Sequence, residues 1–93
     1  MIRGFKEKEA EKIWHGTFSR HLPRNIQSIV RRKLRMLNHS STLNDLRIPP
    51  SNHLEALKGS RKGQHSIRVN DQWRICFVWS KGDAEAIEIV DYH

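Results

Sequence analysis

Two runs of alternating polar and apolar residues dominate the second half of the chain. The first run covers residues 65–69, the second covers residues 73–79, and Asn70-Asp71 lies between them. Two period-two runs joined by a short Asn/Asp turn predict a β-hairpin. Arg74 falls between core-type residues, and alternation therefore predicts that it lies on the sheet face opposite to them.

The first half of the chain has the apolar spacing of helices instead. Residues 6–14 favour a short helix, which Gly16 would end. A second helix is expected to start at residues 22–25, with Pro23 in its first turn, and to fade near residues 38–40. Its apolar stripe consists of Ile26, Ile29, Val30, Leu34 and Leu37.

Three further segments complete the predicted architecture. Met1–Phe5 is expected to form a first strand, and residues 86–92 a last strand after a turn at residues 80–83. The connector at residues 41–52 suggests a helical turn that docks Leu43, Leu46 and Ile48 on the core, followed by an extended exit at Pro49-Pro50. The predicted order is β-α-α-β-β-β. We therefore expect one α+β domain over residues 1–93, with two N-terminal helices packed on a small, mainly antiparallel sheet.

The charge balance adds a prediction about partners. Seventeen Lys and Arg residues against ten Asp and Glu residues give a net charge of +7. No acidic residue occurs between Glu11 and Asp45, and Asp71 is the only one in the basic block at residues 58–74. Such a balance favours a polyanionic partner, with nucleic acid ahead of an anionic membrane.

The single cysteine and the absence of long apolar runs narrow the class of protein. Cys76 alone forms no internal disulfide, and its apolar strand neighbours predict a buried, unreactive thiol. The charged residues 1–13 do not resemble a signal peptide, and no apolar run is long enough to span a bilayer. The expected location is therefore the cytoplasm.

No nucleotide-binding or protease motif occurs, so candidate chemistry comes from residue types near the hairpin. The candidate catalytic residues are Lys58, Arg74, Asp91, Tyr92 and His93. Cationic side chains suit the charge that grows on phosphate during RNA cleavage, whereas histidine, tyrosine or a carboxylate suits proton transfer. Such a set needs no metal or other cofactor. The alternatives are an ordinary chain terminus or, less favoured, a zinc site built from scattered histidines with Asp91.

The segment LKGSRKGQHSIRVNDQWRICFVW at residues 57–79, with IEIVDYH at residues 87–93, resembles the HigB host-inhibition toxins of the RelE/ParE superfamily. The similarity covers the whole chain, from the N-terminal MIRGF to the terminal D-Y-H. It implies a toxin of a bacterial toxin–antitoxin pair that enters the ribosomal A site and cleaves mRNA there. The implied partners are a HigA-type helix-turn-helix antitoxin, the 70S ribosome and mRNA, with no membrane.

The resemblance also implies roles for single residues. Lys58 and Arg74 would neutralise the scissile phosphate, His93 or Asp91 would assist proton transfer, and Tyr92 would stack on the nucleotide. Contacts with RNA are expected from residues of the basic loop, the hairpin and the second helix: Arg61, Lys62, His65, Arg68, Arg31 and Arg35.

The chain departs from the family pattern at one position. HigB toxins can carry an active-site histidine three residues before the loop lysine, where this chain has Glu55, and His53 lies two residues away. A glutamate can act as a base but does not stabilise an anion. Strand parity adds a requirement, because Tyr92 and His93 project oppositely in a regular strand, so the tail must twist for the three terminal residues to converge.

Two other functions fit the same sequence. One is a ParE-like inhibitor of a protein such as gyrase, without nuclease activity, although that activity does not call for the D-Y-H end. The other is a basic RNA- or ribosome-binding module without chemistry. Codon-phased mRNA cleavage that depends on Arg74 would distinguish the nuclease from both.

Overall fold

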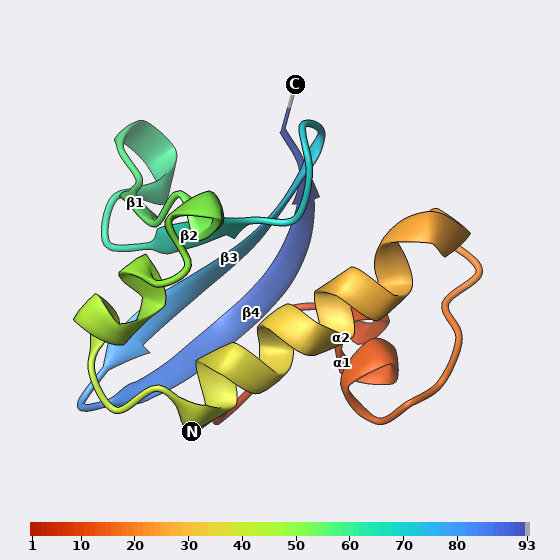
Figure 1. The fold of residues 1–93 in the computed structure, drawn as a ribbon, viewed down its shortest axis with the longest axis horizontal. Helices are drawn as coiled ribbons and strands as arrows, with labels where there is room; N and C mark the ends of the chain where they lie inside the picture. The colour runs from red at the N-terminus through yellow and green to blue at the C-terminus, as the bar shows by residue number, and fades with distance from the viewer. Residues whose placement is uncertain (93) are drawn as a thin grey trace.

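Four strands form a single antiparallel sheet in the order β1-β2-β3-β4, and two helices pack against it (Figure 1). The computed structural model describes residues 1–92. The helices are α1 (Lys8–Trp14) and α2 (Arg24–His39), and the strands are β1 (Glu55–Ala56), β2 (His65–Arg68), β3 (Trp73–Ser80) and β4 (Asp83–Asp91). Three short 3-10 turns lie in the connections: η1 (Leu43–Arg47), η2 (Pro50–Asn52) and η3 (Gly59–Arg61). The predicted α+β class, with helices on a mainly antiparallel sheet, is confirmed.

Local signals fix both ends of α1. The Glu7 side chain caps the helix by accepting hydrogen bonds from the backbone N–H groups of Glu9 and Ala10. Gly16 follows with a φ of 86°, a conformation that favours glycine and ends the helix as predicted. Ala10 and Ile13 are fully buried against the sheet, so the short helix is held mainly by packing.

The apolar stripe of α2 forms the centre of the core. Ile26, Val30, Leu34 and Leu37 are all buried, at the i, i+4, i+8 and i+11 spacing of one helix face. The helix begins after Pro23, in agreement with the sequence, and runs to His39. Its arginine-rich face remains at the surface, apart from Arg31, whose Nε donates to the Ile13 carbonyl at 3.2 Å.

The predicted hairpin is confirmed as β2 and β3. The Asn70 Oδ1 accepts hydrogen bonds from the backbone N–H groups of Gln72 and Trp73, which closes the turn. Ile75 and Phe77 are completely buried on the core face. Cys76 lies on the other face and is also buried, and its burial raises the pKa of the thiol, in agreement with an unreactive cysteine.

The predicted N-terminal strand is wrong in detail. Residues 1–5 lie alongside β4 but form only two isolated parallel bridges, Ile2 with Ala84 and Phe5 with Ile87. The spacing of three residues reflects a bulge in β4, where Ala86 has a φ of 51° and the register with β3 shifts. The fourth strand of the sheet is instead β1, which pairs with β2 through Glu55 and Ser66.

The connector between α2 and β1 is partly as predicted. Leu46 in η1 is buried in the core, whereas Ile48 is 76% exposed and does not dock there. Pro49 is extended, but Pro50 already begins η2 instead of continuing an extended exit. The turn is anchored by Asn52, which is fully buried and donates to the Leu46 carbonyl at 3.1 Å. None of the helices in residues 1–92 is long and apolar enough to cross a membrane.

Candidate active site

Arg74 forms the centre of the candidate site. It lies on β3, on the face opposite to Ile75 and Phe77, as the alternation predicts. Its Nε donates to Ser66 Oγ at 2.7 Å, and its Nη2 donates to the backbone carbonyl of His53. The side chain is only 11% exposed. The guanidinium is therefore a fixed cation with little solvent around it.

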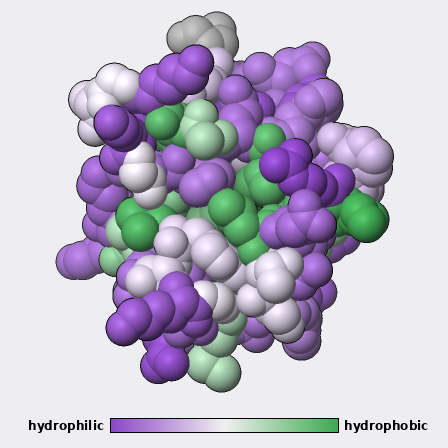
Figure 2. Space-filling model, turned by 90° about the vertical axis from the view of Figure 1, so that its left-hand side faces the viewer, coloured by the Kyte–Doolittle hydropathy of each residue, from purple (hydrophilic) through white to green (hydrophobic). Residues whose placement is uncertain are grey.

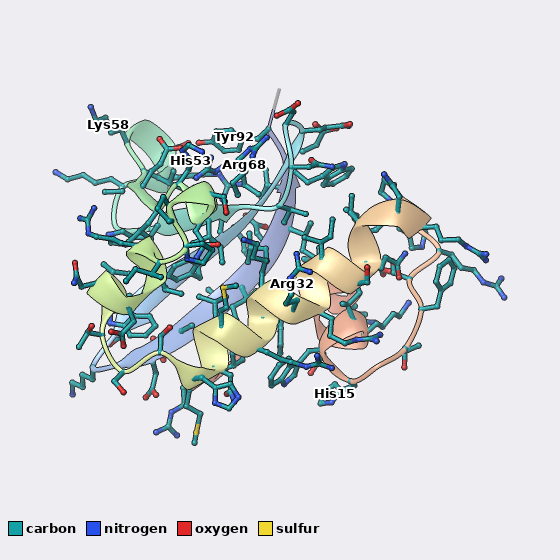
Figure 3. All side chains as sticks on the ribbon, viewed as in Figure 1. His15, Arg32, His53, Lys58, Arg68 and Tyr92 are labelled. Carbon is teal, nitrogen blue, oxygen red and sulfur yellow. The ribbon has the colours of Figure 1, made fainter. Side chains whose placement is uncertain are left out.

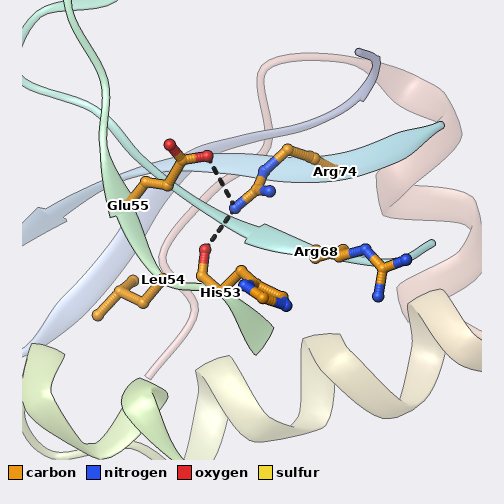
Figure 4. Close-up of a pocket in the computed structure, with 5 residues that line it drawn as sticks. All are labelled: His53, Leu54, Glu55, Arg68 and Arg74. Carbon is orange, nitrogen blue, oxygen red and sulfur yellow. Dashed lines mark hydrogen bonds and ion pairs between the residues drawn. The ribbon is translucent and has the colours of Figure 1, made fainter. Parts of the chain in front are cut away.

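A pocket of about 440 Å³ opens beside this guanidinium. Residues 53–55, which lead into and begin β1, form one wall, and Arg68 and Arg74 from β2 and β3 form the other (Figure 4). Arg68 and Arg74 are directly paired in the β2–β3 register, so strand pairing places two cations on one face of the sheet. The pocket is thus suited to an anion.

Tyr92 lies next to Arg74, as expected if both residues belong to one site. The Arg74 Cζ is 5.7 Å from the centroid of the Tyr92 ring, within the range of a cation–π contact. The Tyr92 backbone N–H donates to the Gln72 carbonyl at 2.6 Å, which ties the end of the chain to the hairpin turn. Tyr92 as a residue is 41% exposed, so part of it is accessible to a partner.

Of the other two terminal residues, Asp91 does not lie on the same face of the sheet as Arg74. Asp91 pairs in register with Trp73, which places it on the face opposite to Arg74, and its Oδ2 accepts a hydrogen bond from Gln72 at 3.1 Å. His93 lies outside the described residues. The β3–β4 register therefore does not place Asp91 beside Arg74 and Tyr92, where the sequence led us to expect it.

The cations of the basic loop have different surroundings. Lys58 is exposed, two residues after the end of β1, and projects outward from the loop, away from Tyr92 and Arg68 (Figure 3). Arg61 points to the sheet and forms an ion pair with Glu88, 2.5 Å from Nη1 to Oε1; this hydrogen bond raises the pKa of the guanidinium. Lys62 is exposed. Of the three, Arg61 is committed to an internal contact, and the two lysines are accessible to a partner.

The remaining residues predicted to contact RNA are divided between surfaces. Arg68 lines the pocket and bonds to Asp71 across the hairpin turn. Arg31 and Arg35 lie on α2, outside the pocket lining, and Arg35 is exposed.

The expectation for His65 is not supported by its position. His65 pairs with Phe77 in the β2–β3 register, so it shares the core face, and the two rings stack with centroids 6.3 Å apart. Burial lowers the pKa of His65, and its Nδ1 is buried without a hydrogen-bond partner among the described residues. We therefore assign His65 a packing role. The alternation that marked residues 65–69 already contained this signal.

Sequence reasoning missed the groups that hold Arg74. Ser66 is fully buried beside it, and the His53 contribution comes from a backbone carbonyl, which no side-chain motif reveals. Glu55, whose role the sequence left open, lies with its Oε1 3.3 Å from Arg74 Nη2. Ser66 lies two residues before Arg68 and therefore on the same face of β2. This spacing could have predicted that Ser66 faces the site. No cluster of three metal-binding side chains occurs within residues 1–92.

The face of the molecule that carries the connectors before β1 is mainly hydrophilic, with apolar side chains scattered between the polar ones (Figure 2). A scattered distribution of this kind is ordinary for a protein surface.

Comparison with known sequences gives a consistent family match. Residues 3–93 match the family described as RelE-like toxin of type II toxin-antitoxin system HigB. Toxin HigB-1 of Vibrio cholerae serotype O1 is 43% identical over 86 residues, which cover 90% of each chain. Endoribonuclease HigB of Proteus vulgaris is 29% identical over 93 residues, which cover 100% of both chains.

Solved structures with similar folds give the same picture of the architecture. A mutant of YafQ from E. coli superimposes with a TM-score of 0.64 at 16% identity, over 98% of this chain and 93% of that one. YafQ from E. coli strain BL21(DE3) has a TM-score of 0.58 at 15% identity, with the same coverage. At these identities the likeness concerns the fold alone.

Proposed function

Because the chain belongs to the HigB family of RelE-like toxins of type II toxin–antitoxin systems, we propose that it cleaves mRNA in the ribosomal A site and so inhibits translation and growth. A type II toxin has an antitoxin protein as its partner, and we propose a HigA-type helix-turn-helix protein in that role. The observation that carries the nuclease proposal is the contact of Tyr92 with Arg74, which itself lines the pocket together with Arg68.

Arg74 is suited to stabilise the transition state of phosphodiester cleavage. The 2′-oxygen of the ribose attacks phosphorus while the bond to the 5′-oxygen breaks, so negative charge grows on the phosphoryl oxygens. A fixed guanidinium in a partly water-excluded site interacts more strongly with that charge than a mobile one in water. The bonds to Ser66 and His53 provide this fixation before substrate arrives.

The other roles follow from position. Tyr92 offers an exposed ring beside Arg74 on which a nucleobase can stack. Lys58 is exposed, and its long side chain is flexible. We therefore assign it to an RNA phosphate that approaches the outer side of the basic loop. We assign proton transfer to His93, which follows Tyr92 in the sequence. Asp91 is assigned to positioning, through its bond to Gln72 in the turn that also holds Tyr92.

Docking on the ribosome is proposed for the basic surfaces outside the pocket. Lys62 and Arg35 of α2 are exposed cations, and phosphate contacts of this kind provide affinity and orientation without reading sequence. This arrangement separates binding to ribosomal RNA from cleavage of the message, since Arg35 and the pocket lie on different elements.

The test is to map mRNA 5′ ends in cells that express the wild type or Arg74→Ala. Codon-phased cuts are expected with the wild type and should disappear with Arg74→Ala, whose guanidinium is lost. Arg20→Ala is the control for an exposed arginine outside the pocket and the proposed docking surface, and it should keep codon-phased cuts. Intact mRNA with damaged DNA under the wild type would point to inhibition of a protein such as gyrase. Growth inhibition without either would leave only a binding module.

A second variant protects the test from a folding artefact. Arg74→Ala leaves Ser66, Glu55 and the His53 carbonyl without their cation. Arg74→Lys keeps the positive charge but lacks the planar pair of donors. We expect Arg74→Lys to fold and to cleave much less than the wild type. Full cleavage by a folded Arg74→Lys would show that the guanidinium geometry is not required.

A further inference from the structure

Arg74 already has an anion beside it in this structure. The Glu55 carboxylate lies with Oε1 3.3 Å from Arg74 Nη2, at the edge of the same pocket that would receive a phosphate (Figure 4). A carboxylate and a phosphodiester both carry one negative charge and both accept hydrogen bonds from a guanidinium. The two anions therefore compete for the same cation.

The two members of this ion pair are held very differently. The Arg74 side chain is 11% exposed and is bonded to Ser66 and to the His53 carbonyl, whereas the Glu55 side chain is 50% exposed. Glu55 belongs to β1, a strand of only two residues at the edge of the sheet. Arg74 is thus the fixed partner, and the Glu55 side chain is the one that can move into solvent.

The remaining contacts of Arg74 favour displacement over simultaneous binding. Among residues 1–92, Arg74 Nε donates to Ser66 Oγ, and Nη2 donates to the His53 carbonyl, has a longer contact of 3.5 Å with the Ser66 carbonyl and pairs with Glu55. A phosphate that takes a bidentate position on the guanidinium needs the Nη2 edge that Glu55 occupies. The backbone and hydroxyl contacts can remain, because they only hold the side chain in place.

We propose that Glu55 is a resident counter-ion that occupies the phosphate position on Arg74 and is displaced when an RNA phosphodiester binds. The inference rests on the proposed function and adds a regulation to that site. In the free protein, Glu55 neutralises the cation and weakens its affinity for phosphates in general. Only an RNA whose other contacts hold it in the pocket displaces the carboxylate.

A purely structural role for Glu55 leads to a different expectation. If the carboxylate only positioned Arg74, its removal would loosen the guanidinium and weaken phosphate binding. If it competes with phosphate, its removal strengthens binding. The sign of the effect therefore separates the two roles.

The test measures binding of a short RNA in which every 2′-hydroxyl carries a methyl group, so that it cannot be cleaved. Dissociation constants are measured for the wild type, Glu55→Gln, Glu55→Ala and the control Glu11→Gln. Glu11 is an exposed glutamate on α1, so this control removes one negative charge outside the pocket. We expect both Glu55 variants to bind about 2–5-fold more tightly than Glu11→Gln, the range set by a partly exposed ion pair.

The same measurement in an Arg74→Lys background completes the design. The gain from Glu55→Gln should shrink there, because lysine lacks the edge for which the two anions compete. Equal or weaker binding by both Glu55 variants than by Glu11→Gln would overturn the inference, and so would failure of all the proteins to bind. Codon-phased cleavage by the wild type in cells would still support the proposed function in either case, so the two failures are distinguishable.

Discussion

The guanidinium of Arg74 and the ring of Tyr92 are the two groups whose contact joins the hairpin to the end of the chain. Arg74 is placed by strand alternation on β3, and Tyr92 by a backbone hydrogen bond to the turn residue Gln72. Their distance of 5.7 Å from Cζ to ring centroid places the proposed phosphate-binding group next to the proposed stacking surface. The proposed chemistry depends on these two residues more than on the total positive charge.

The buried His65 leads to a prediction about how the stability of the fold depends on pH. Burial lowers the pKa of His65 below its ordinary value of 6.5, so the folded state binds fewer protons than the unfolded state as the pH falls below 6.5. Stability should therefore be full above pH 6.5 and should decrease as the pH falls toward the lowered pKa.

The matched variants are His65→Phe, which keeps an aromatic ring on Phe77, and His15→Phe, which changes an exposed histidine. Urea unfolding at several pH values gives the free energy of unfolding. We expect the decrease between pH 6.5 and 5 to be smaller in His65→Phe and unchanged in His15→Phe. An identical decrease in all three proteins would refute a neutral, buried His65.

At the scale of elements, the turn η2 connects the core to the pocket. Asn52 is completely buried, accepts a hydrogen bond from Lys33 of α2 and donates to the Leu46 carbonyl. The next residue, His53, supplies the carbonyl that holds Arg74. Burial lowers the pKa of Lys33, so this lysine depends on Asn52 as its acceptor within the described residues.

Asn52→Ala should therefore weaken both the fold and the site. The substitution leaves the Lys33 ammonium and a carbonyl unsatisfied, which costs roughly 2–4 kcal/mol in the free energy of unfolding. Lys33→Met, which removes the buried charge itself, should cost less. Denaturant unfolding of both variants measures the difference. An Asn52→Ala protein as stable as the wild type would mean that η2 is not anchored by this side chain.

The elements differ in how far the sequence predicts them. The hairpin and α2 have long periodic patterns, with the Asn70-Asp71 turn in the first and Pro23 at the start of the second, and both appear as expected. Residues 1–5 and Glu55–Ala56 contain too few residues to show a period, and their pairing is decided by neighbours distant in the sequence. The bulge at Ala86 and the β1–β2 ladder are tertiary features of this kind.

The sequence predicted only the part of the candidate site that strand alternation positions. Arg74, Arg68 and Tyr92 are positioned by alternation and by the end of the last strand, so sequence reasoning brings them together. Asp91 is assigned to the other face by the same parity, and His65 belongs to the core row. The ion pair of Glu55 with Arg74 and the carbonyl of His53 depend on where the connector crosses the edge of the sheet, which no local pattern specifies.

At the scale of the whole molecule, positive charge and chemistry occupy different places. The net charge of +7 is spread over α2, the basic loop and the hairpin. The pocket itself contains only two arginines among its lining residues, and Glu55 of the same chain pairs with one of them, Arg74. The distributed charge fits attraction to ribosomal RNA, which any phosphate backbone would share. Selectivity for cleavage then has to come from the pocket.

The most direct test of this account is a double-mutant cycle on mRNA cleavage by purified toxin on programmed ribosomes. Single-turnover rates are compared for the wild type, Arg74→Lys, Tyr92→Ala and the protein with both changes. We predict that each single change lowers the rate by about 100-fold or more, and that the double change lowers it by far less than the product, because the two groups hold the phosphate and the base of one nucleotide. Wild-type rates in folded single variants, or losses that simply multiply, would contradict a shared site at Arg74 and Tyr92.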